Sequence, residues 1–311
     1  MTPQALVAPD EVAERKRWMH VAEKGSVLGI RLLIWLATVA GRGPARLVVR
    51  LVAGWYTLMH PSVRAASRAW WRRILGREPT LGEIYQHVLR FAQTTLDRFF
   101  FLQGRDDVFQ MSHTGADFLA DLRARNQGAI ILTAHVGSPA AMSAQGRAHK
   151  LRMHIVGYFK NAAMINDVMA KLDPTSMARV VHIEPGNVNS VFAIRERVEA
   201  GDLLAIACDR VGINDRFVEV DFFGEKAAFP TGPFILAGML HCPVYIAYAL
   251  YHEPDRYDLY CEPFADPLDL PRKDREAALQ RHVARYAARM EHYCRLAPDN
   301  WFNFFDFWSK H

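Results

Sequence analysis

Residues 128–139 read GAIILTAHVGSP, and this stretch has the pattern of a buried strand followed directly by a helix. Residues 128–134 are almost entirely apolar, as expected for a strand that is covered on both faces. Ser138 is a favoured helix N-cap, and Pro139 is favoured at the first helical position. His135 is therefore predicted to lie in the turn at the carboxyl end of the strand, where open α/β sheets bind their ligands.

Short β-rich runs alternate with helical stretches on the C-terminal side of this segment. The further strands are predicted at residues 153–159, 178–183, 203–208, 218–224, 243–251 and 257–263, with antiparallel pairing among the last three. The helices are predicted at residues 162–171, 188–199 and 274–296. This alternation predicts an α/β fold with a mixed, largely parallel sheet flanked by helices.

The N-terminal third has a different character. Residues 1–103 are predicted to form basic amphipathic helices with breaks near 41–44 and 60–61, and residues 104–311 are predicted to form the α/β core, the two together making one structural unit. The apolar run 27–41 would span about 22 Å as a helix, which is less than the roughly 30 Å of a bilayer core. Residues typical of helices that lie in a membrane surface follow it: Arg46, Arg50, Trp55, Tyr56 and the Trp-Trp-Arg-Arg run at 70–73. We expect this region to contact a membrane with salt-sensitive affinity, and a helical layer packed on the core is the alternative.

The composition suits one large domain and excludes several classes of site. The chain has 311 residues, half of them hydrophobic, so it can bury a large core. Its 38 Lys and Arg residues exceed its 33 Asp and Glu residues, and the net charge of +5 suits an acidic partner. The four cysteines are widely separated, and metal-ligand, P-loop and dinucleotide-binding motifs are absent. We predict no metal, no cofactor and no nucleic-acid partner. Because the first residues lack an apolar signal segment, the chemistry is expected on the cytosolic side.

Two parts of an acyl-transfer site are predicted around His135. A neutral imidazole can take a proton from a hydroxyl group, and the free N–H groups of the helix start can hold a developing oxyanion. Asp209 and Arg210 follow the predicted strand 203–208 and should lie at the same sheet edge as His135. The Arg210 guanidinium suits a phosphate group of the acceptor or the donor. In isolation, however, a histidine in this position is more often a structural residue at a strand end.

Three blocks in a fixed order resemble the lipid A biosynthesis (late) acyltransferase family, which belongs to the lysophospholipid acyltransferase superfamily. They are TAHVGSP at 133–139, CDR at 208–210 and FFGEKAAFPTGPF at 222–234. The likeness extends from residues 18–29 to the closing WFNFFDFW at 301–308. It implies a glycerolipid acyltransferase-like fold with N-terminal membrane-associating helices. The implied location is the cytoplasmic face of a bacterial inner membrane, in peripheral or monotopic form.

The resemblance also implies a reaction and a set of site residues. A fatty acyl group would pass from an acyl-carrier-protein or coenzyme A thioester to a hydroxyl or amine of a membrane lipid acceptor. His135 takes the position of the general base, and Asp209 and Arg210 belong to the same cleft. The candidate substrate-binding residues are Ser138, Lys160, Glu184, Gly224, Pro230 and Gly232. For Lys160 and Glu184, a solvated loop position is the simpler interpretation.

One position departs from the family pattern. In the family, an Asp or Glu follows the histidine after four intervening residues and orients its imidazole, and here that position is Ala140. Three explanations are open: an introduced substitution that inactivates or impairs an engineered enzyme, a natural loss in a binding-only relative, or a rearranged site in which a carboxylate such as Asp209 takes over. The intact state of the other blocks favours the first, and Ala140→Glu is then expected to raise transfer by about two to four orders of magnitude. A catalytically silent lipid-binding or scaffold protein and an acyl-thioester hydrolase are the alternative functions.

Overall fold

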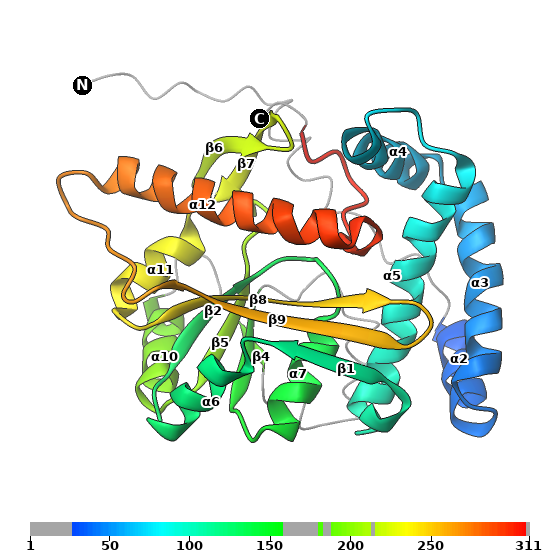
Figure 1. The fold of residues 1–311 in the computed structure, drawn as a ribbon, viewed down its shortest axis with the longest axis horizontal. Helices are drawn as coiled ribbons and strands as arrows, with labels where there is room; N and C mark the ends of the chain where they lie inside the picture. The colour runs from blue at the N-terminus through cyan, green and yellow to red at the C-terminus, as the bar shows by residue number, and fades with distance from the viewer. Residues whose placement is uncertain (1–26, 158–179, 183–187, 213–214, 309–311) are drawn as a thin grey trace.

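A computed structural model describes residues 27–157, 180–182, 188–212 and 215–308 of the chain (Figure 1). The described helices are α2 (Val27–Val39), α3 (Arg42–Met59), α4 (Pro61–Leu75), α5 (Leu81–Leu102), η1 (Asp106–Val108), α6 (Ala116–Ala124), α7 (Pro139–Ala148), α10 (Val188–Glu199), α11 (Gly232–Leu240), α12 (Arg275–Leu296) and η3 (Pro298–Asn300). The predicted interruptions of the N-terminal helices fall at Gly41 and His60. The predicted helix at 162–171 lies outside the described residues.

The described strands form one large mixed sheet and one small hairpin. They are β1 (Gln110–Thr114), β2 (Ala129–Thr133), β3 (Met153–Gly157), β4 (Val180–His182), β5 (Leu203–Ala207), β6 (Phe217–Phe222), β7 (Glu225–Pro230), β8 (Val244–His252) and β9 (Arg256–Ala265). The seven-stranded sheet has the order β1-β9-β8-β2-β5-β3-β4. Within it only β8 and β9 pair antiparallel, and β6 and β7 form a separate antiparallel pair. The predicted α/β fold with a largely parallel sheet is confirmed.

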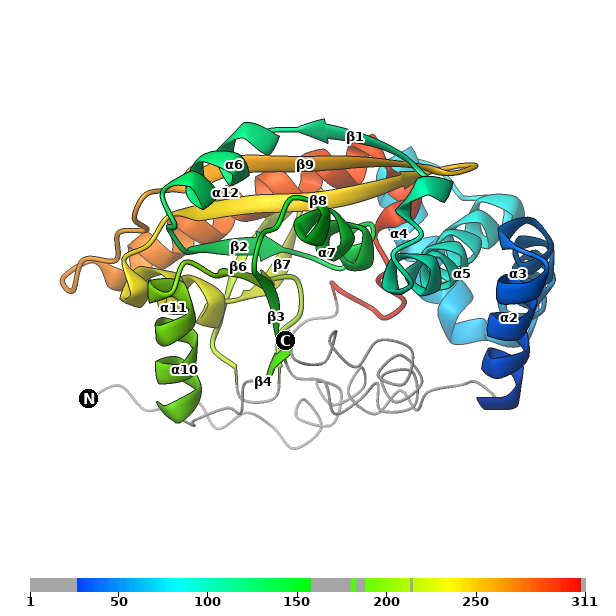
Figure 2. The ribbon, with the colours of Figure 1, turned by 90° about the horizontal axis from the view of Figure 1, so that it is seen from below.

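Helices cover both faces of the large sheet, which explains why its central strands are so apolar (Figure 2). Along β2, Ile130 and Leu132 belong to a buried cluster shared with α10, α11, α12 and β6–β7. Ala129 and Ile131 point the other way, into a second cluster shared with α3, α5, α6 and α7. Because alternate side chains of a strand face opposite sides, only a nearly continuous apolar run can serve both clusters.

The aromatic pair of α4 belongs to the core and not to a membrane interface. Trp70 is 2 % exposed, and its indole N–H donates to the carbonyl of Pro298 at 2.8 Å. Its ring lies 4.7 Å from that of Trp301, centroid to centroid. Trp71 is buried in the same cluster. The expectation that residues 70–73 act as interfacial aromatics is therefore wrong for both tryptophans, because both side chains are buried in the core.

An exposed apolar surface does occur on α2 and α3, which lie side by side at one end of the molecule (Figures 1 and 2). Its large exposed side chains are Leu28, Leu32, Trp35 and Val39 of α2 and Leu47, Val48, Leu51, Val52, Trp55, Leu58 and Met59 of α3. We call this surface the α2–α3 apolar face. Among the described residues, no helix combines the length and the hydrophobicity needed to cross a bilayer.

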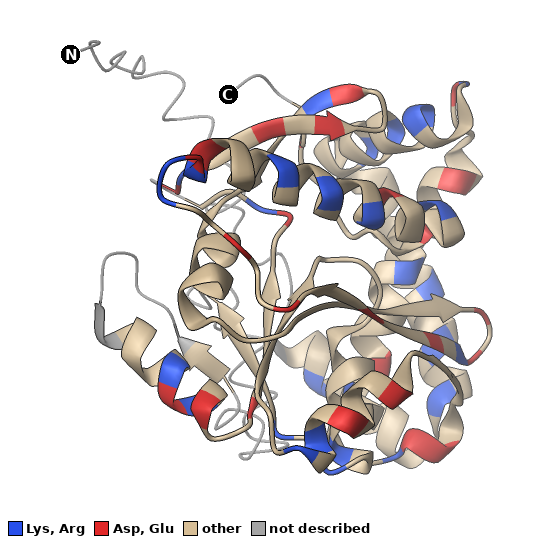
Figure 3. Cartoon of the chain, turned by 60° about the vertical axis from the view of Figure 1, so that its left-hand side comes forward, with Lys and Arg blue, Asp and Glu red and all other residues tan. Residues whose placement is uncertain are grey.

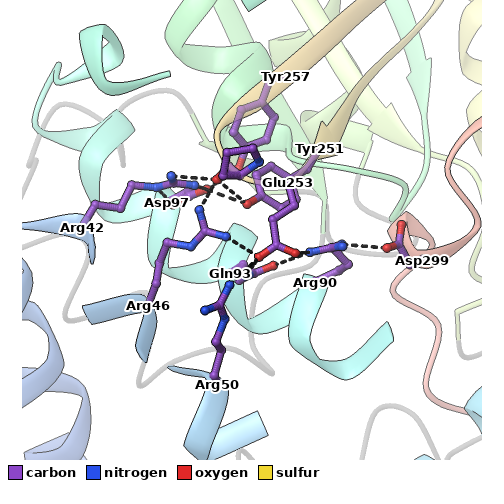
Figure 4. Close-up of polar contacts among 11 residues, drawn as sticks. Arg42, Arg46, Arg50, Arg90, Gln93, Asp97, Tyr251, Glu253, Tyr257 and Asp299 are labelled. Carbon is purple, nitrogen blue, oxygen red and sulfur yellow. Dashed lines mark hydrogen bonds and ion pairs between the residues drawn. The ribbon is translucent and has the colours of Figure 1, made fainter. Parts of the chain in front are cut away.

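The arginines of α3 meet carboxylates of α5 and of the turn between β8 and β9, as Figure 4 shows. Arg42 makes two hydrogen bonds to the carboxylate of Asp97, at 2.7 and 2.8 Å. Arg46 and Arg50 both bind one carboxylate oxygen of Glu253, at 2.6 and 3.0 Å. The expectation that Arg46 serves as an interfacial basic residue thus needs correction, because its guanidinium group is buried and paired with the turn between β8 and β9. Arg50 pairs with the same carboxylate but keeps half of its side chain exposed.

Candidate active site

His135 lies where the sequence predicts it, directly after β2, and a glycine holds the turn in shape. Gly137 has a φ of +71° and forms a bridge to Ala249 of β8. A Cβ atom at position 137 would lie 1.9 Å from the carbonyl oxygen of Ala249, so only glycine fits there. The amide of Ser138 donates to that same carbonyl at 2.8 Å. Residues 135–138, which we call the histidine turn, are therefore fixed against the centre of the sheet.

Helix α7 begins as the sequence indicates, but Ser138 is committed to starting it. Its hydroxyl accepts a hydrogen bond from the amide of Ala141 at 3.2 Å, and the residue is only 3 % exposed. Pro139 is the first helical residue. Ser138 is thus confirmed as the N-cap, while its expected role in binding substrate loses support because the hydroxyl is buried and bonded.

The carboxylate that contacts His135 belongs to Asp209, which follows the neighbouring strand β5. Nδ1 of His135 lies 2.8 Å from Oδ1 of Asp209. The backbone N–H of His135 donates to Oδ2 of the same carboxylate at 3.1 Å. The Asp209 side chain is 2 % exposed, whereas that of His135 is 38 % exposed. Solvent and ligands can therefore reach the histidine but not its carboxylate.

This pairing keeps Asp209 ionised. Burial by itself would raise the pKa of Asp209, but the charge and the hydrogen bond of His135 outweigh it, and the pKa falls to about 2. A carboxylate can only accept at Nδ1, so in the neutral imidazole the proton sits on Nδ1 and Nε2 is left as a base. The geometry therefore supplies an oriented histidine with a permanently charged partner.

Trp301 is a site residue that sequence reasoning missed. Its indole N–H donates to Oδ2 of Asp209 at 3.2 Å, so that oxygen accepts two hydrogen bonds. The backbone around Trp301 runs antiparallel to the histidine turn: Phe302 N–H donates to the carbonyl of His135, and Gly137 N–H donates to that of Asn300, both at 2.8 Å. In the sequence, the closing segment contributes only to the family resemblance, and no local pattern links it to His135.

The predicted oxyanion site at the start of α7 needs correction, because most of its amides are engaged. The N–H groups of Gly137, Ser138 and Ala141 already donate within the protein, and Pro139 has no N–H group. Of the amides at this helix start, that of Ala140 remains as the candidate donor to an oxyanion. The side chain of Ala140 is half-buried and packs against the cluster that includes α5 and α7.

Arg210 is turned toward the C-terminal segment, residues 301–308. Its Nη2 donates to the carbonyl of Phe302 at 3.2 Å, and the guanidinium lies 5.6 Å from the ring centroid of Phe305. Burial lowers the pKa of Arg210, against the opposing charge of Asp209. The sequence correctly placed Asp209 and Arg210 at the edge that carries His135, as the carboxyl ends of adjacent parallel strands require.

The remaining candidates do not converge on one point. Gly224 forms the turn between β6 and β7 with a φ of +80°, whereas Pro230 ends β7 and Gly232 begins α11. At about 3.3 Å per strand residue, Gly224 lies roughly 20 Å along the chain from Pro230. These residues therefore cannot contact one small substrate group together, and Gly224 is the outlier. Lys160 and Glu184 lie outside the described residues.

A cavity of about 290 Å³ opens on the α7 side of the sheet. Its apolar walls include Leu119, Ala120, Ile131, Met142, Leu151 and Leu259. His113 and Gln145 also line it and meet each other at 2.9 Å. Met142 lies in the first turn of α7, two residues after Ala140 in the sequence. The volume is at the lower end of the range for small-molecule sites, about 300–1000 Å³.

Arginines recur along α12, as the blue bands of that helix in Figure 3 show, but neighbouring acids pair with several of them. The pairs are Arg281 with Asp274 at 3.0 Å, Arg289 with Glu262 at 2.7 Å, and Arg295 with Glu291 at 2.6 Å. The arginines of α12 should therefore attract an acidic partner less strongly than the net charge alone implies. In the described parts of the chain, no cluster of three or more His, Cys, Asp or Glu residues could hold a metal ion.

One protein family matches the chain. Residues 95–310 fit the family model described as bacterial lipid A biosynthesis acyltransferase. The matched part covers more than half of the 311 residues, and it includes the histidine turn, Asp209, the cavity and the segment around Trp301. The search of curated protein sequences found no significant match.

Proposed function

The chain belongs to the bacterial lipid A biosynthesis acyltransferase family, and we propose that it transfers a fatty acyl group from a thioester donor to a lipid acceptor with His135 as the base and Asp209 as its acidic partner. The family implies a lipid acceptor and an acyl donor. The observation that carries the proposal is the 2.8 Å contact between Nδ1 of His135 and the buried carboxylate of Asp209. It favours the explanation that the site has been rearranged around Asp209, so that Ala140 is compatible with turnover.

The proposed reaction is a direct transfer. Nε2 of His135 takes the proton from the hydroxyl or amine of the acceptor as that group attacks the thioester carbonyl carbon. The tetrahedral intermediate then collapses, the C–S bond breaks, and the departing thiolate takes the proton back from the imidazolium ion. Asp209 stabilises the imidazolium ion and fixes the ring in the basic tautomer. The amide of Ala140 is the candidate donor to the oxyanion.

The cavity on the α7 side supports an aliphatic substrate. Most of its walls are apolar and suit a fatty acyl chain, although Asp117 and Arg123 are also among the residues that line it. Met142 and Gly146 of α7 both line it, so the cavity runs along the helix that starts beside His135. The donor in this proposal is an acyl-carrier-protein or coenzyme A thioester with its chain in this cavity.

We also propose that the α2–α3 apolar face docks on a bilayer, as a peripheral or monotopic contact at the cytoplasmic face of a bacterial inner membrane. Eleven large apolar side chains are exposed on the two helices, which is unusual for a surface that only meets water. Trp35 and Trp55 are among them, and tryptophan favours the interface between head groups and acyl chains. Docking at this face brings the acceptor lipid to the protein.

The test is a transfer assay with purified protein in phospholipid vesicles, supplied with acyl-carrier-protein or coenzyme A thioesters, with lipid products identified by mass spectrometry. We expect an acylated lipid from the unchanged chain and none from His135→Ala. Loss of thioester without an acylated lipid would replace the proposal with a hydrolase. Binding of lipid without any turnover, over a range of acceptors, would replace it with a silent lipid-binding relative.

A further inference from the structure

Residues 299–302 form a short segment that holds the histidine and its carboxylate in place, and we call it the C-terminal strap. Its backbone makes the two hydrogen bonds to the histidine turn, and Trp301 supplies the indole N–H to Asp209. The side chain of Asn300 also pairs with the backbone of Tyr251 in β8, at 2.7 and 3.1 Å. The strap thus touches His135 and Asp209 at the same time.

Helix α5 anchors the strap at two points. Nε2 of His87 lies 2.7 Å from the carbonyl oxygen of Trp301. Nε of Arg90 donates to Oδ2 of Asp299 at 2.7 Å. Asp299 in turn accepts from the side-chain amide of Asn300 at 2.9 Å. The position of Trp301 therefore depends on a helix that precedes His135 by more than thirty residues.

Arg90 does more than hold Asp299, because it bridges two carboxylates (Figure 4). Its Nη1 donates to Glu253 at 2.6 Å, on the same side chain that Arg46 and Arg50 bind from α3. Burial works against ionisation of Glu253, but hydrogen bonds from Arg90 and its neighbours lower the pKa of that carboxyl to about 2. Glu253 is therefore charged throughout the physiological range. A planar guanidinium can serve two carboxylates in fixed directions, which an ammonium group cannot reproduce.

We propose that Arg90 and Asp299 are positioning residues for the reaction, acting through the C-terminal strap and Trp301 on the pair formed by Asp209 and His135. The inference rests on the proposed function, because it assigns these residues to the same site. Neither residue needs to contact substrate. Their substitution should lower turnover with little effect on substrate affinity, since the base loses its alignment while the binding surfaces stay intact.

The first measurement is the indole N–H resonance of Trp301, which is identified by its loss in Trp301→Phe. Arg90→Lys and Asp299→Asn should each shift it, because both loosen the strap that sets the hydrogen bond to Asp209. Arg289→Lys is the matched control, since Arg289 makes a similar two-bond pair with Glu262 on another part of the surface. It should leave the resonance in place. This measurement needs no turnover.

The second measurement is steady-state transfer by the full chain in phospholipid vesicles. We expect Arg90→Lys and Asp299→Asn to lower kcat about tenfold, the scale of one lost charge-assisted hydrogen bond, with KM within twofold, and Arg289→Lys to keep kcat within twofold. Adding Arg90→Lys to Trp301→Phe should cost less than twofold more, because both act on one contact.

An unshifted resonance in both Arg90→Lys and Asp299→Asn would overturn the inference, as would an equal loss of kcat in Arg289→Lys. Should the unchanged chain show no transfer at all, the proposed function fails, and the resonance alone still decides whether Arg90 and Asp299 set the position of Trp301. If Arg90→Lys does not fold, Asp299→Asn carries the test.

Discussion

Replacing Asp209 by asparagine should remove the base while leaving the shape of the site unchanged. In the native site, Oδ2 accepts from the His135 amide and from the Trp301 indole, and Oδ1 accepts from Nδ1. An asparagine has only one acceptor oxygen. Two fixed N–H donors face the Oδ2 position, so we expect the amide oxygen of the asparagine there. Its NH₂ group then takes the Oδ1 position, which faces Nδ1 and its movable proton. The NH₂ group would donate to Nδ1 and drive the imidazole proton onto Nε2, where the base is needed.

The size of the effect follows from tautomer and charge together. Inverting the tautomer and losing the charge that stabilises the imidazolium ion costs about two to four orders of magnitude in kcat, as in a serine-protease triad. Asp209 also contributes stability, because its pKa is lowered from 3.8 to about 2 in the folded protein. That shift corresponds to about 2 kcal/mol, present above pH 3.8 and lost as the pH falls toward 2.

The assay compares kcat for lipid acylation and the melting temperature across matched variants. Asp202→Asn is the control, because Asp202 binds His154 at 2.9 Å in a second buried histidine–aspartate pair at the opposite end of β5. We expect Asp202→Asn to lower the melting temperature and to keep kcat within about twofold. If Asp209→Asn retains kcat within threefold of the unchanged chain, Asp209 is not the partner on which His135 depends.

Position 140 offers a second check on the same reasoning. Because Nδ1 of His135 already has a carboxylate partner, Ala140→Glu alone should not raise transfer, contrary to the expectation from the family motif. In the Asp209→Asn background, the added glutamate has an imidazole without a carboxylate to bind, and a partial recovery of kcat is expected. A gain of two orders of magnitude from Ala140→Glu in the otherwise unchanged chain would contradict the role of Asp209.

Three further predictions concern the rest of the chain. Burial lowers the pKa of His87 to about 4 against the opposing hydrogen bond to Trp301, so the unfolded state binds more protons than the folded state between pH 6.5 and 4. As the pH falls from 6.5 to 4, the free energy of unfolding should therefore fall by about 3 kcal/mol. Urea titrations of His87→Gln should show a flatter pH dependence. Gly146→Leu places four carbons in the cavity, so in a competition among acyl thioesters the variant should prefer acyl chains about four carbons shorter. An unchanged chain-length preference would exclude the cavity as the acyl site. Because the arginines of α3 are paired with carboxylates, vesicle binding should change little between about 50 and 500 mM salt, contrary to the expectation from the sequence. Binding should be lost in Leu51→Glu, because Leu51 is 70 % exposed on the α2–α3 apolar face. Binding that is salt-sensitive and survives this substitution would locate the membrane contact elsewhere.

Much of the fold could be predicted because it depends on short-range patterns. The apolar run of β2, the N-cap at Ser138 and the proline after it each set local structure within a few residues. The rule that parallel strands share one carboxyl edge was enough to bring Asp209 beside His135. By contrast, Trp70 and Arg46 look interfacial in sequence, and only their partners in space show that one is core and the other an internal ion pair.

The α/β class, the succession of strand, histidine and helix, and the edge of the sheet at which chemistry is possible can all be inferred from local patterns. Which carboxylate contacts Nδ1 of His135, and that Trp301 donates to that carboxylate, became visible in the folded protein alone. His135 and Asp209 are 74 residues apart, and Asp209 and Trp301 are 92 residues apart. Helix and strand periodicities extend over only a few residues, so they cannot encode which distant side chains meet. Those contacts are selected when both faces of the sheet are covered and the buried polar groups must each find a partner.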